Sequence, residues 1–411
     1  MRTNGDLFGG VVVVIDDDAE DSSSNIAKII DQIDKAHCPV IKFTKLPSDK
    51  VLNNLRAASF FVVDWNLHGE ALDSLAPGEH LQVPSTLKAS ERKDILDFLT
   101  ALKAIKFSPI FIFTDAPVDE VKQILKEKKI ITGEDNDHVF VMAKKAVVSR
   151  GLTQVLAAWI KKVPSAYILK HWEKEYERAK NELFIDFYTN SPLWPLIFWN
   201  TYRADGVEPS HEIGSMIGRN LSSRVSNLDC NLTPAIGKYS EELSGVSDEH
   251  RTLLKKVLEG ERFIPASRLA KHSVAPGDIF KKGGDYYINI RPDCDCIPRG
   301  SAKLDSLKLY LLKGQRLTAN NESNAFRPGF GLFEERGFEA IMFAVDDGQT
   351  VAFKLKEITV QSWRSWKGKR VGRLIGPHLT GLQQRFAGYL QRPGTSRIPT
   401  QAVRALAATQ A

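Results

Sequence analysis

Near its start the chain reads Val11-Val12-Val13-Val14-Ile15-Asp16-Asp17-Asp18, an apolar β-branched run that ends in three carboxylates. A strand that is apolar on both faces belongs inside a parallel sheet that helices cover on both sides. Further apolar runs, the first of them weaker, follow at Val40–Phe43, Phe60–Val63, Ile110–Phe113 and Val139–Met142. Amphipathic helical patterns separate them, at Asn25–Ala36, Asp49–Ala57, Arg92–Ile105 and Val118–Lys128. This alternation predicts an α/β domain with a doubly wound parallel sheet.

Polar residues follow four of the predicted strands, namely Asp16-Asp17-Asp18, Asp64, Thr114 and Lys144-Lys145. The carboxyl ends of the strands in such a sheet share one edge, where these folds place their chemistry. Carboxylates gathered there repel one another unless a cation joins them. Mg²⁺ accepts carboxylates and keeps its other sites for water and phosphate. The pattern therefore predicts a Mg²⁺ site at this edge of the sheet.

An aspartate beside Mg²⁺ can act as the nucleophile toward a phosphoryl group, whose oxygens a lysine and a hydroxyl then stabilise. We therefore expect Asp64 to be the phospho-acceptor, assisted by Thr114 and Lys144. The expected Mg²⁺ ligands are Asp16, Asp17 and Asp64. Asp18 is expected to turn toward the following helix.

Each of these residues also has a purely structural interpretation. The carboxylates Asp16–Asp18 would be favoured at a solvated helix N-terminus by the helix dipole. Asp64 and Thr114 could each serve as a helix N-cap. The two lysines could be surface residues, and Lys145 competes with Lys144 for the role of site lysine.

Taken in order along the strands, these residues resemble the receiver domains of bacterial two-component response regulators, over about residues 8–150. Ile15-Asp16-Asp17 resembles the acidic pair of that family. Val62-Val63-Asp64-Trp65-Asn66-Leu67 resembles the segment around its phospho-acceptor. Ile112-Phe113-Thr114 is similar to the segment whose hydroxyl follows the phosphoryl group during switching, and Lys144 lies where the family has its lysine.

The resemblance implies a flavodoxin-like fold, a requirement for Mg²⁺ and phosphorylation by a separate histidine kinase in a His-to-Asp phosphorelay. It also implies a signalling protein that catalyses only its own phosphorylation. Its output would be controlled or buffered through the rest of the chain, with a partner protein or a second regulator as its target. A degenerate receiver that binds a partner without accepting phosphate is the alternative within this family.

Several residues depart from the family pattern. Neither Lys144 nor Lys145 is followed by proline, Thr114 is followed by Asp115, and residues 66–91 form a long insertion beside Asp64. The usual aromatic switch position holds Val141 or Met142, with Phe140 only nearby. These departures weaken the expectation of the family's coupled Tyr/Thr switch. They are similar to those of a divergent receiver branch, which resembles the receivers of phosphorelay-type anti-phage defence systems.

The remainder of the chain changes pattern twice. Helical patterns dominate up to about residue 260, where the aromatic segment Pro192–Trp199 is expected to be buried, and strand patterns follow. Hairpin signals lie at Lys281-Lys282-Gly283-Gly284 and at Asp346-Asp347-Gly348. We therefore predict a receiver-like domain at 1–162, a helical connector at 163–260, a β-rich α+β output domain at 261–390 and a flexible tail at 391–411.

The segment Trp363-Arg364-Ser365-Trp366-Lys367-Gly368-Lys369-Arg370 interleaves basic residues with tryptophan, as nucleic-acid contacts do. Buried tryptophans beside a solvated basic edge are the interpretation that we favour. The alternative function is a nucleic-acid-binding effector whose receiver-like domain is only a docking platform. A hydrolase or nuclease in this half has less support, because no nucleophile–base pair or metal-ligand set emerges. Cys294 and Cys296 have the wrong spacing for a zinc knuckle.

Composition bounds the class of protein. The 411 residues are 43% apolar and 26% charged, which is typical of a soluble protein with two or three domains. Residues 1–150 have a net charge of −4 and the rest of the chain +10, which suggests two separate roles. The four cysteines and the lack of a secretory leader fit the cytoplasm. The longest uncharged run, Phe187–Tyr202, is shorter than the ~20 residues of a membrane span, so no membrane partner is expected.

Overall fold

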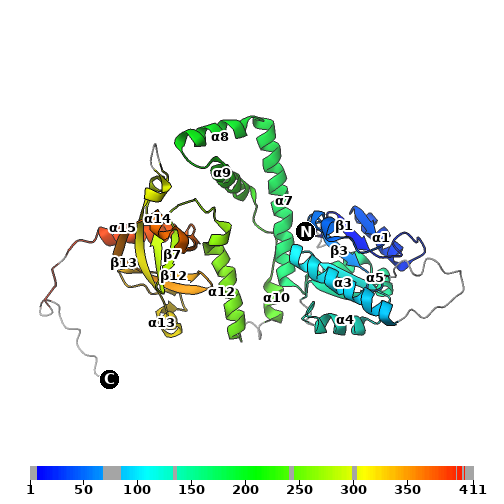
Figure 1. Ribbon diagram of the computed structural model, residues 1–411. Coiled ribbons are helices and arrows are strands. Elements are labelled where there is room, and N and C mark those ends of the chain that lie inside the picture. The colour runs from blue at the N-terminus through cyan, green and yellow to red at the C-terminus, as the bar shows by residue number, and fades with distance from the viewer. Residues whose placement is uncertain are drawn as a thin grey trace, which may run out of the picture. The chain divides into compact units, whose positions relative to one another are not determined.

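The computed structural model describes residues 7–67, 85–132, 137–239, 245–298 and 303–394, together with 396–399 and Ala402. Most of the insertion at 66–91 and of the tail at 391–411 lies outside these residues. The chain forms two compact units (Figure 1). The first consists of Met1–Pro192 and Ile217–Ser240, and the second of Leu193–Met216 and Glu241–Ala411. None of the described helices is long and apolar enough to span a membrane.

The first unit contains the predicted parallel sheet, whose five strands lie in the order β2-β1-β3-β4-β5. The strands are β1 (Val12–Ile15), β2 (Val40–Phe43), β3 (Phe60–Val63), β4 (Ile110–Thr114) and β5 (Val139–Ala143). The helices around them are α1 (Asn25–Lys35), α2 (Asp49–Asn54), α3 (Ser85–Ile105), α4 (Val118–Glu127), α5 (Lys144–Arg150) and α6 (Leu152–Ile160). The predicted α/β architecture is confirmed, with each strand within one residue of its expected bounds.

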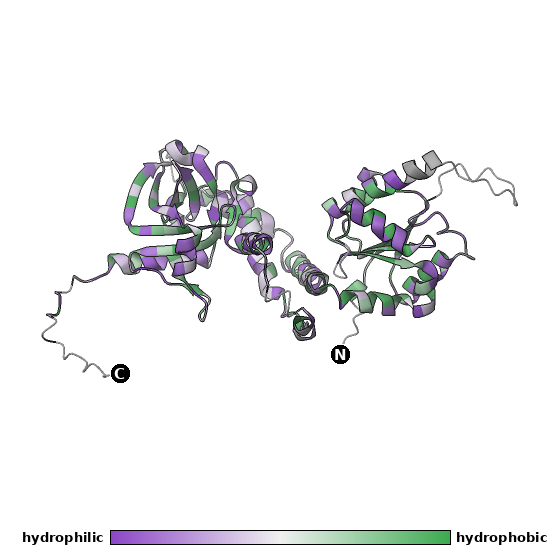
Figure 2. Cartoon of the chain, turned by 90° about the horizontal axis from the view of Figure 1, so that it is seen from below, coloured by the Kyte–Doolittle hydropathy of each residue, from purple (hydrophilic) through white to green (hydrophobic). Residues whose placement is uncertain are grey.

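The sheet has an apolar layer on each of its faces, and the apolar colour in Figure 2 follows the strands and the inner sides of the helices. Helix α1 shows why the sequence folds this way. Its four isoleucines recur at helical spacing and are all buried, and Ser24 caps its N-terminus by accepting a hydrogen bond from the Ala27 N–H. Phe111 packs edge-on against Phe60 and Trp159 in the same layer.

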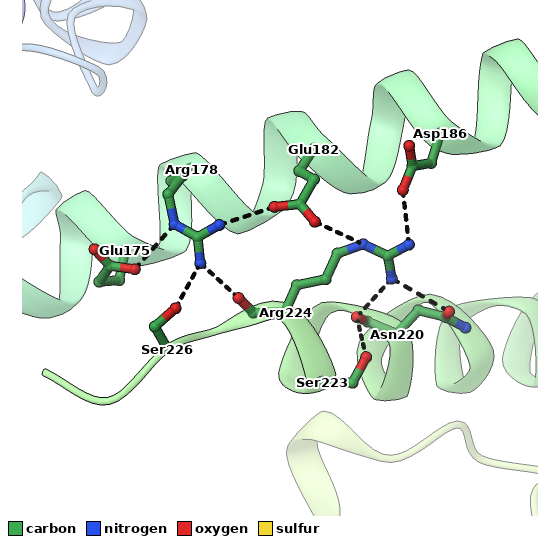
Figure 3. A network of polar contacts seen from close by, with 8 residues as sticks. All are labelled: Glu175, Arg178, Glu182, Asp186, Asn220, Ser223, Arg224 and Ser226. Carbon is green, nitrogen blue, oxygen red and sulfur yellow. Dashed lines mark hydrogen bonds and ion pairs between the residues drawn. The ribbon is translucent and has the colours of Figure 1, made fainter.

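A long helix, α7 (Pro164–Asn190), continues from this domain. Two arginines join it to the end of α9 (Pro209–Arg224), as Figure 3 shows. Arg178 binds Glu182 and also donates to the Arg224 carbonyl, while Arg224 pairs with Asp186 at 2.9 Å. This network fixes the C-terminal end of α9 against α7. The short helix α10 (Thr233–Lys238) follows.

The expectation that Pro192–Trp199 is buried is wrong. The segment leads into α8 (Trp194–Asp205), in which no residue is buried. Leu196, Ile197 and Trp199 are all exposed. The density of aromatic residues predicted burial because such residues usually lie in a core, but the described part of the chain provides no cover for this helix.

The second unit contains a seven-stranded antiparallel sheet in the order β12-β13-β9-β8-β7-β14-β6. Its strands are β6 (Phe263–Pro265), β7 (Asp278–Lys282), β8 (Asp285–Asn289), β9 (Lys308–Arg316), β12 (Glu339–Val345), β13 (Gln349–Ser362) and β14 (Arg370–Leu374). A two-stranded ribbon, β10 (Phe326–Arg327) with β11 (Leu332–Phe333), stands apart from it. The helices of this part are α12 (Asp248–Arg262), α13 (Ala319–Ala325), α14 (Trp363–Trp366) and α15 (His378–Leu390). Both predicted hairpins are present, between β7 and β8 and between β12 and β13.

The basic segment that starts at Trp363 is largely built into this unit. Trp363 and Trp366 are buried and pack edge-on against Phe280, which confirms the interpretation of core tryptophans. Arg370 is partly buried, lies 3.5 Å from Asp278 and donates to backbone carbonyls. Buried rings cannot stack on bases, and the Arg370 guanidinium is already bound to Asp278 and to backbone carbonyls.

Candidate functional site

The candidate site lies at the carboxyl edge of the parallel sheet of the first unit. Asp16 follows β1, Asp64 follows β3, Thr114 ends β4 and Lys144 begins α5 directly after β5. The backbone continues the strand pairing up to this point, because the Asp64 N–H donates to the Ile15 carbonyl at 2.8 Å. The strand ends therefore place these side chains at the common edge, as the sequence pattern predicts.

Lys144 joins the two buried carboxylates. Its Nζ lies 2.9 Å from Asp64 Oδ2, to which it donates a hydrogen bond, and 2.7 Å from Asp16 Oδ2. The second contact is a buried ion pair. All three side chains are buried, whereas Lys145 is exposed. Of the two candidate lysines, only Lys144 reaches the carboxylates.

The protonation of the cluster follows from its burial. Burial raises the pKa of Asp64 to about 6, although the Lys144 cation opposes the rise. Burial raises the pKa of Asp16 for the same reason. Burial alone would lower the pKa of Lys144, but the two carboxylates outweigh it and raise that pKa to about 12. The lysine is therefore a permanent cation at neutral pH.

The acidic residues after β1 could hold a metal ion. Each of Asp16, Asp17 and Asp18 offers a carboxylate oxygen within 4.8 Å of the others, and this is the only such group among the residues described. Asp18 therefore belongs to this group, although the sequence predicts that it turns toward the following helix, and the expected ligand Asp64 does not belong to it. Asp16 Oδ1 accepts from the Asp18 N–H at 3.0 Å, and its Oδ2 faces the Lys144 ammonium at 2.7 Å. A set of three carboxylates fits a hard cation such as Mg²⁺, which prefers oxygen ligands.

Thr114 and Asp64 each accept a hydrogen bond from the backbone of a following residue. Thr114 is buried, and its Oγ1 accepts from the Ala116 N–H at 3.0 Å, which leaves its own hydroxyl proton for another acceptor. Asp64 Oδ1 accepts from the Trp65 N–H at 2.7 Å. Sequence patterns cannot reveal this backbone donor, because every residue except proline has one.

In the second unit Cys296 is buried beside Asn289 and Cys294 is exposed.

No protein-family model matches this chain, and no curated protein matches it either. The geometry of the site therefore carries the functional argument.

We predict that Asp64→Asn stabilises the first unit by about 1–3 kcal/mol at neutral pH in the presence of a chelator. The folded protein binds the Asp64 proton more tightly than the unfolded chain does, so ionisation of this carboxyl weakens the fold as the pH rises from about 4 to 6. An amide removes that cost and can still accept from the Trp65 N–H. The extra stability of Asp64→Asn over the wild type should be complete above about pH 6 and vanish toward about pH 4.

The measurement is the denaturant midpoint of the first unit at several pH values. Asp115→Asn, at an exposed position nearby, is the matched control and should leave the midpoint unchanged. A loss of stability in Asp64→Asn at neutral pH would contradict the account of the buried charge.

Proposed function

We propose that this chain is a response-regulator-like phospho-acceptor, with Asp64 as the residue that takes the phosphoryl group in a His-to-Asp phosphorelay. The observation that carries the proposal is the Lys144 ammonium between the buried carboxylates of Asp16 and Asp64. Burying two carboxylates and a lysine at a sheet edge is costly for a merely structural purpose. Clusters of perturbed ionisable groups are typical of functional sites.

The strand order supports the same proposal. The order β2-β1-β3-β4-β5 is that of flavodoxin-like sheets, which bind their ligands outside the carboxyl ends of the strands. Asp16, Asp64, Thr114 and Lys144 come from four different strand ends at that edge. Residues far apart in the sequence thus meet where the fold favours chemistry.

The roles of the side chains follow from their contacts. Asp64 forms the new bond from a carboxylate oxygen to phosphorus while the bond from phosphorus to the donor's imidazole nitrogen breaks. Lys144 neutralises charge on the transferred group, and Thr114 donates its hydroxyl proton to one of the phosphoryl oxygens. Asp16 and Asp17, with Asp64, would hold Mg²⁺, which neutralises the phosphoryl oxygens when bound. The resulting aspartyl phosphate is an acyl phosphate.

The proposed partner is a histidine kinase, and the second unit is the proposed output or interaction part. Within it, residues 261–390 correspond to the predicted β-rich domain, whereas the predicted connector, 163–260, is divided between the two units. The cytoplasm is the proposed location, and a phosphorelay in anti-phage defence is the proposed setting, because the departures after Thr114 and Lys144 resemble that receiver branch. The burial of both tryptophans speaks against base stacking by the nucleic-acid alternative, while Arg364 and Lys367 of the same segment stay exposed.

The experiment that tests this function is phosphorylation of the full chain by a small acyl-phosphate donor. With Mg²⁺ present, the protein should acquire one phosphoryl group per chain, labile to both acid and alkali. Labelling should require the metal, and chelation should prevent it. An acid-stable label, or none at all with any donor or kinase, would contradict the proposal.

A second prediction concerns the metal. Asp16→Asn with Asp17→Asn should weaken Mg²⁺ binding by at least about tenfold, because two carboxylate charges are lost. Asp16 is fully buried rather than facing solvent, but an asparagine can keep accepting from the Asp18 N–H. Titration calorimetry measures the affinity, and circular dichroism checks the fold. The control removes two exposed charges, Glu20→Gln with Asp31→Asn, and should bind Mg²⁺ normally. Equal affinities in both variants would place the metal elsewhere.

A further inference from the structure

Helix α12 turns a polar side toward one end of the sheet in the second unit. Thr252, Lys255, Lys256 and Glu259 recur at intervals of three and four residues, which places them on one side of the helix. The Glu259 carboxylate accepts from two backbone N–H groups of the β12–β13 turn at 3.0 and 2.8 Å. The Lys255 ammonium lies 2.7 Å from a carboxylate of α13. These contacts hold α12, α13 and the turn together.

The same elements form the walls of a cavity of about 220 Å³. Its lining comes from α12, the end of β9, the start of α13 and the β12–β13 turn. Of the eleven lining residues, only Leu317 and Ala319 have an apolar side chain. The cavity therefore suits a polar molecule. An apolar cavity of about 150 Å³ holds benzene, so this one has room for on the order of ten non-hydrogen atoms.

A buried hydroxyl in the lining of this cavity has no partner. Thr350 at the start of β13 is 2% exposed, and its Oγ1 has no hydrogen-bond partner among the residues that the structure describes. Its backbone carbonyl, by contrast, accepts from the Leu317 N–H at 2.8 Å. Buried hydroxyls are normally satisfied, because an unmet hydrogen bond weakens the fold. A polar molecule in the cavity would supply the partner that the chain does not.

The charges of the lining favour an anion. It contains three cations, Lys255, Lys256 and Arg316, and two carboxylates, Glu322 and Asp347, which leaves a net charge of +1. Lys255 is neutralised by Glu322. Lys256 and Arg316 are exposed, and neither has an ion-pair partner within the described part of the chain. A guanidinium can hold a carboxylate or a phosphate through two parallel hydrogen bonds, so Arg316 is the stronger of the two anion ligands.

We propose that this cavity binds a small hydroxylated organic anion, either a phosphate ester or a carboxylate. Its acidic group would lie on Arg316 and Lys256. Its hydroxyl groups would bond to Thr350 Oγ1 and to the Asp347 carboxylate, which needs a hydrogen-bond donor and would repel a plain inorganic anion. The inference does not depend on phosphorylation of the first unit.

The test is calorimetric titration of the full chain with three compounds of one carbon skeleton: glycerol 3-phosphate, glycerate and glycerol. A chelator keeps metal, and with it phosphate, away from Asp64. At least one of the two anions should bind with a dissociation constant below about 1 mM, and glycerol should not bind. The tighter of the two anions shows whether the acidic group is a phosphate or a carboxylate. Failure of both anions to bind up to about 10 mM, or equal binding of glycerol, would overturn the proposal.

Two variants locate the binding. Arg316→Gln should weaken it by at least about tenfold, because an amide has no charge to offer the acidic group. Arg364→Gln removes another exposed arginine of this unit, outside the cavity, and should bind like the wild type. Thr350→Val keeps the shape of the side chain and should weaken binding by about fivefold.

The fold should persist in each variant, which circular dichroism checks. Thr350→Val should also keep the denaturant midpoint of the unliganded unit, because its hydroxyl has no hydrogen bond within the described residues to lose. Unchanged affinity in both Arg316→Gln and Thr350→Val would place the anion elsewhere on the chain and overturn the proposal.

Discussion

Asp64→Ala should abolish phosphorylation of this protein completely, under conditions in which the wild type takes up one phosphoryl group. Asp64 is the carboxylate at the end of β3 whose oxygens face a backbone N–H and the Lys144 ammonium. Alanine removes the nucleophile from the end of the strand. The measurement is incorporation of label from a small phosphodonor in the presence of Mg²⁺.

The matched control is Asp115→Ala, which removes an exposed carboxylate at the same edge of the sheet. Its labelling should equal that of the wild type. Circular dichroism of both variants separates loss of chemistry from loss of fold. Undiminished labelling of Asp64→Ala would exclude Asp64 as the acceptor, whatever the other site residues do.

Trp363→Ala should destabilise the second unit by about 3–5 kcal/mol, the usual cost of deleting a large buried aromatic side chain. Trp363 is fully buried, packs edge-on against Phe280 and has the Arg370 guanidinium over its ring. Hydrogen exchange of the backbone amides in β7, β8 and β9 measures the effect within the full chain. Those amides should exchange at least about a hundredfold faster than in the wild type.

Arg364→Ala is the control for this prediction, because Arg364 neighbours the tryptophan but is exposed. Its exchange rates should stay close to those of the wild type, since such substitutions change stability by at most about 0.5 kcal/mol. If instead Trp363→Ala left exchange unchanged and reduced binding of single-stranded DNA or RNA, the tryptophan would be a stacking surface and its place in the core would be wrong.

The parallel sheet could be predicted because its strands are buried on both faces and therefore consist of unbroken apolar runs, as in Val12–Ile15. The meeting of these side chains at one sheet edge could be predicted for a related reason. Strands that run in one direction bring their ends together, so Asp16, Asp64 and Lys144 meet although they are far apart in the sequence. Lys144 and Lys145 could not be told apart, because which one faces the carboxylates depends on the residue at which β5 ends.

Other features depend on packing that the sequence does not show. The apolar segment before and within α8 predicts burial, yet burial requires a neighbour, and the pattern of one helix says nothing about its neighbours. Arg370 looks like a surface cation in its own segment. It is held partly buried by Asp278, which lies 92 residues earlier in the chain. Long-range ion pairs of this kind leave no local pattern.

The most direct test of the central claim is to locate the phosphoryl group on the wild-type chain. Borohydride reduces an aspartyl phosphate to homoserine, so a phosphorylated sample treated in this way and mapped by peptide mass spectrometry carries a permanent mark at the acceptor. The account predicts homoserine at position 64, in the peptide that contains Val62 to Leu67, and only when Mg²⁺ was present. Homoserine at another aspartate, or a phosphoryl group retained on a serine, threonine or histidine, would contradict it.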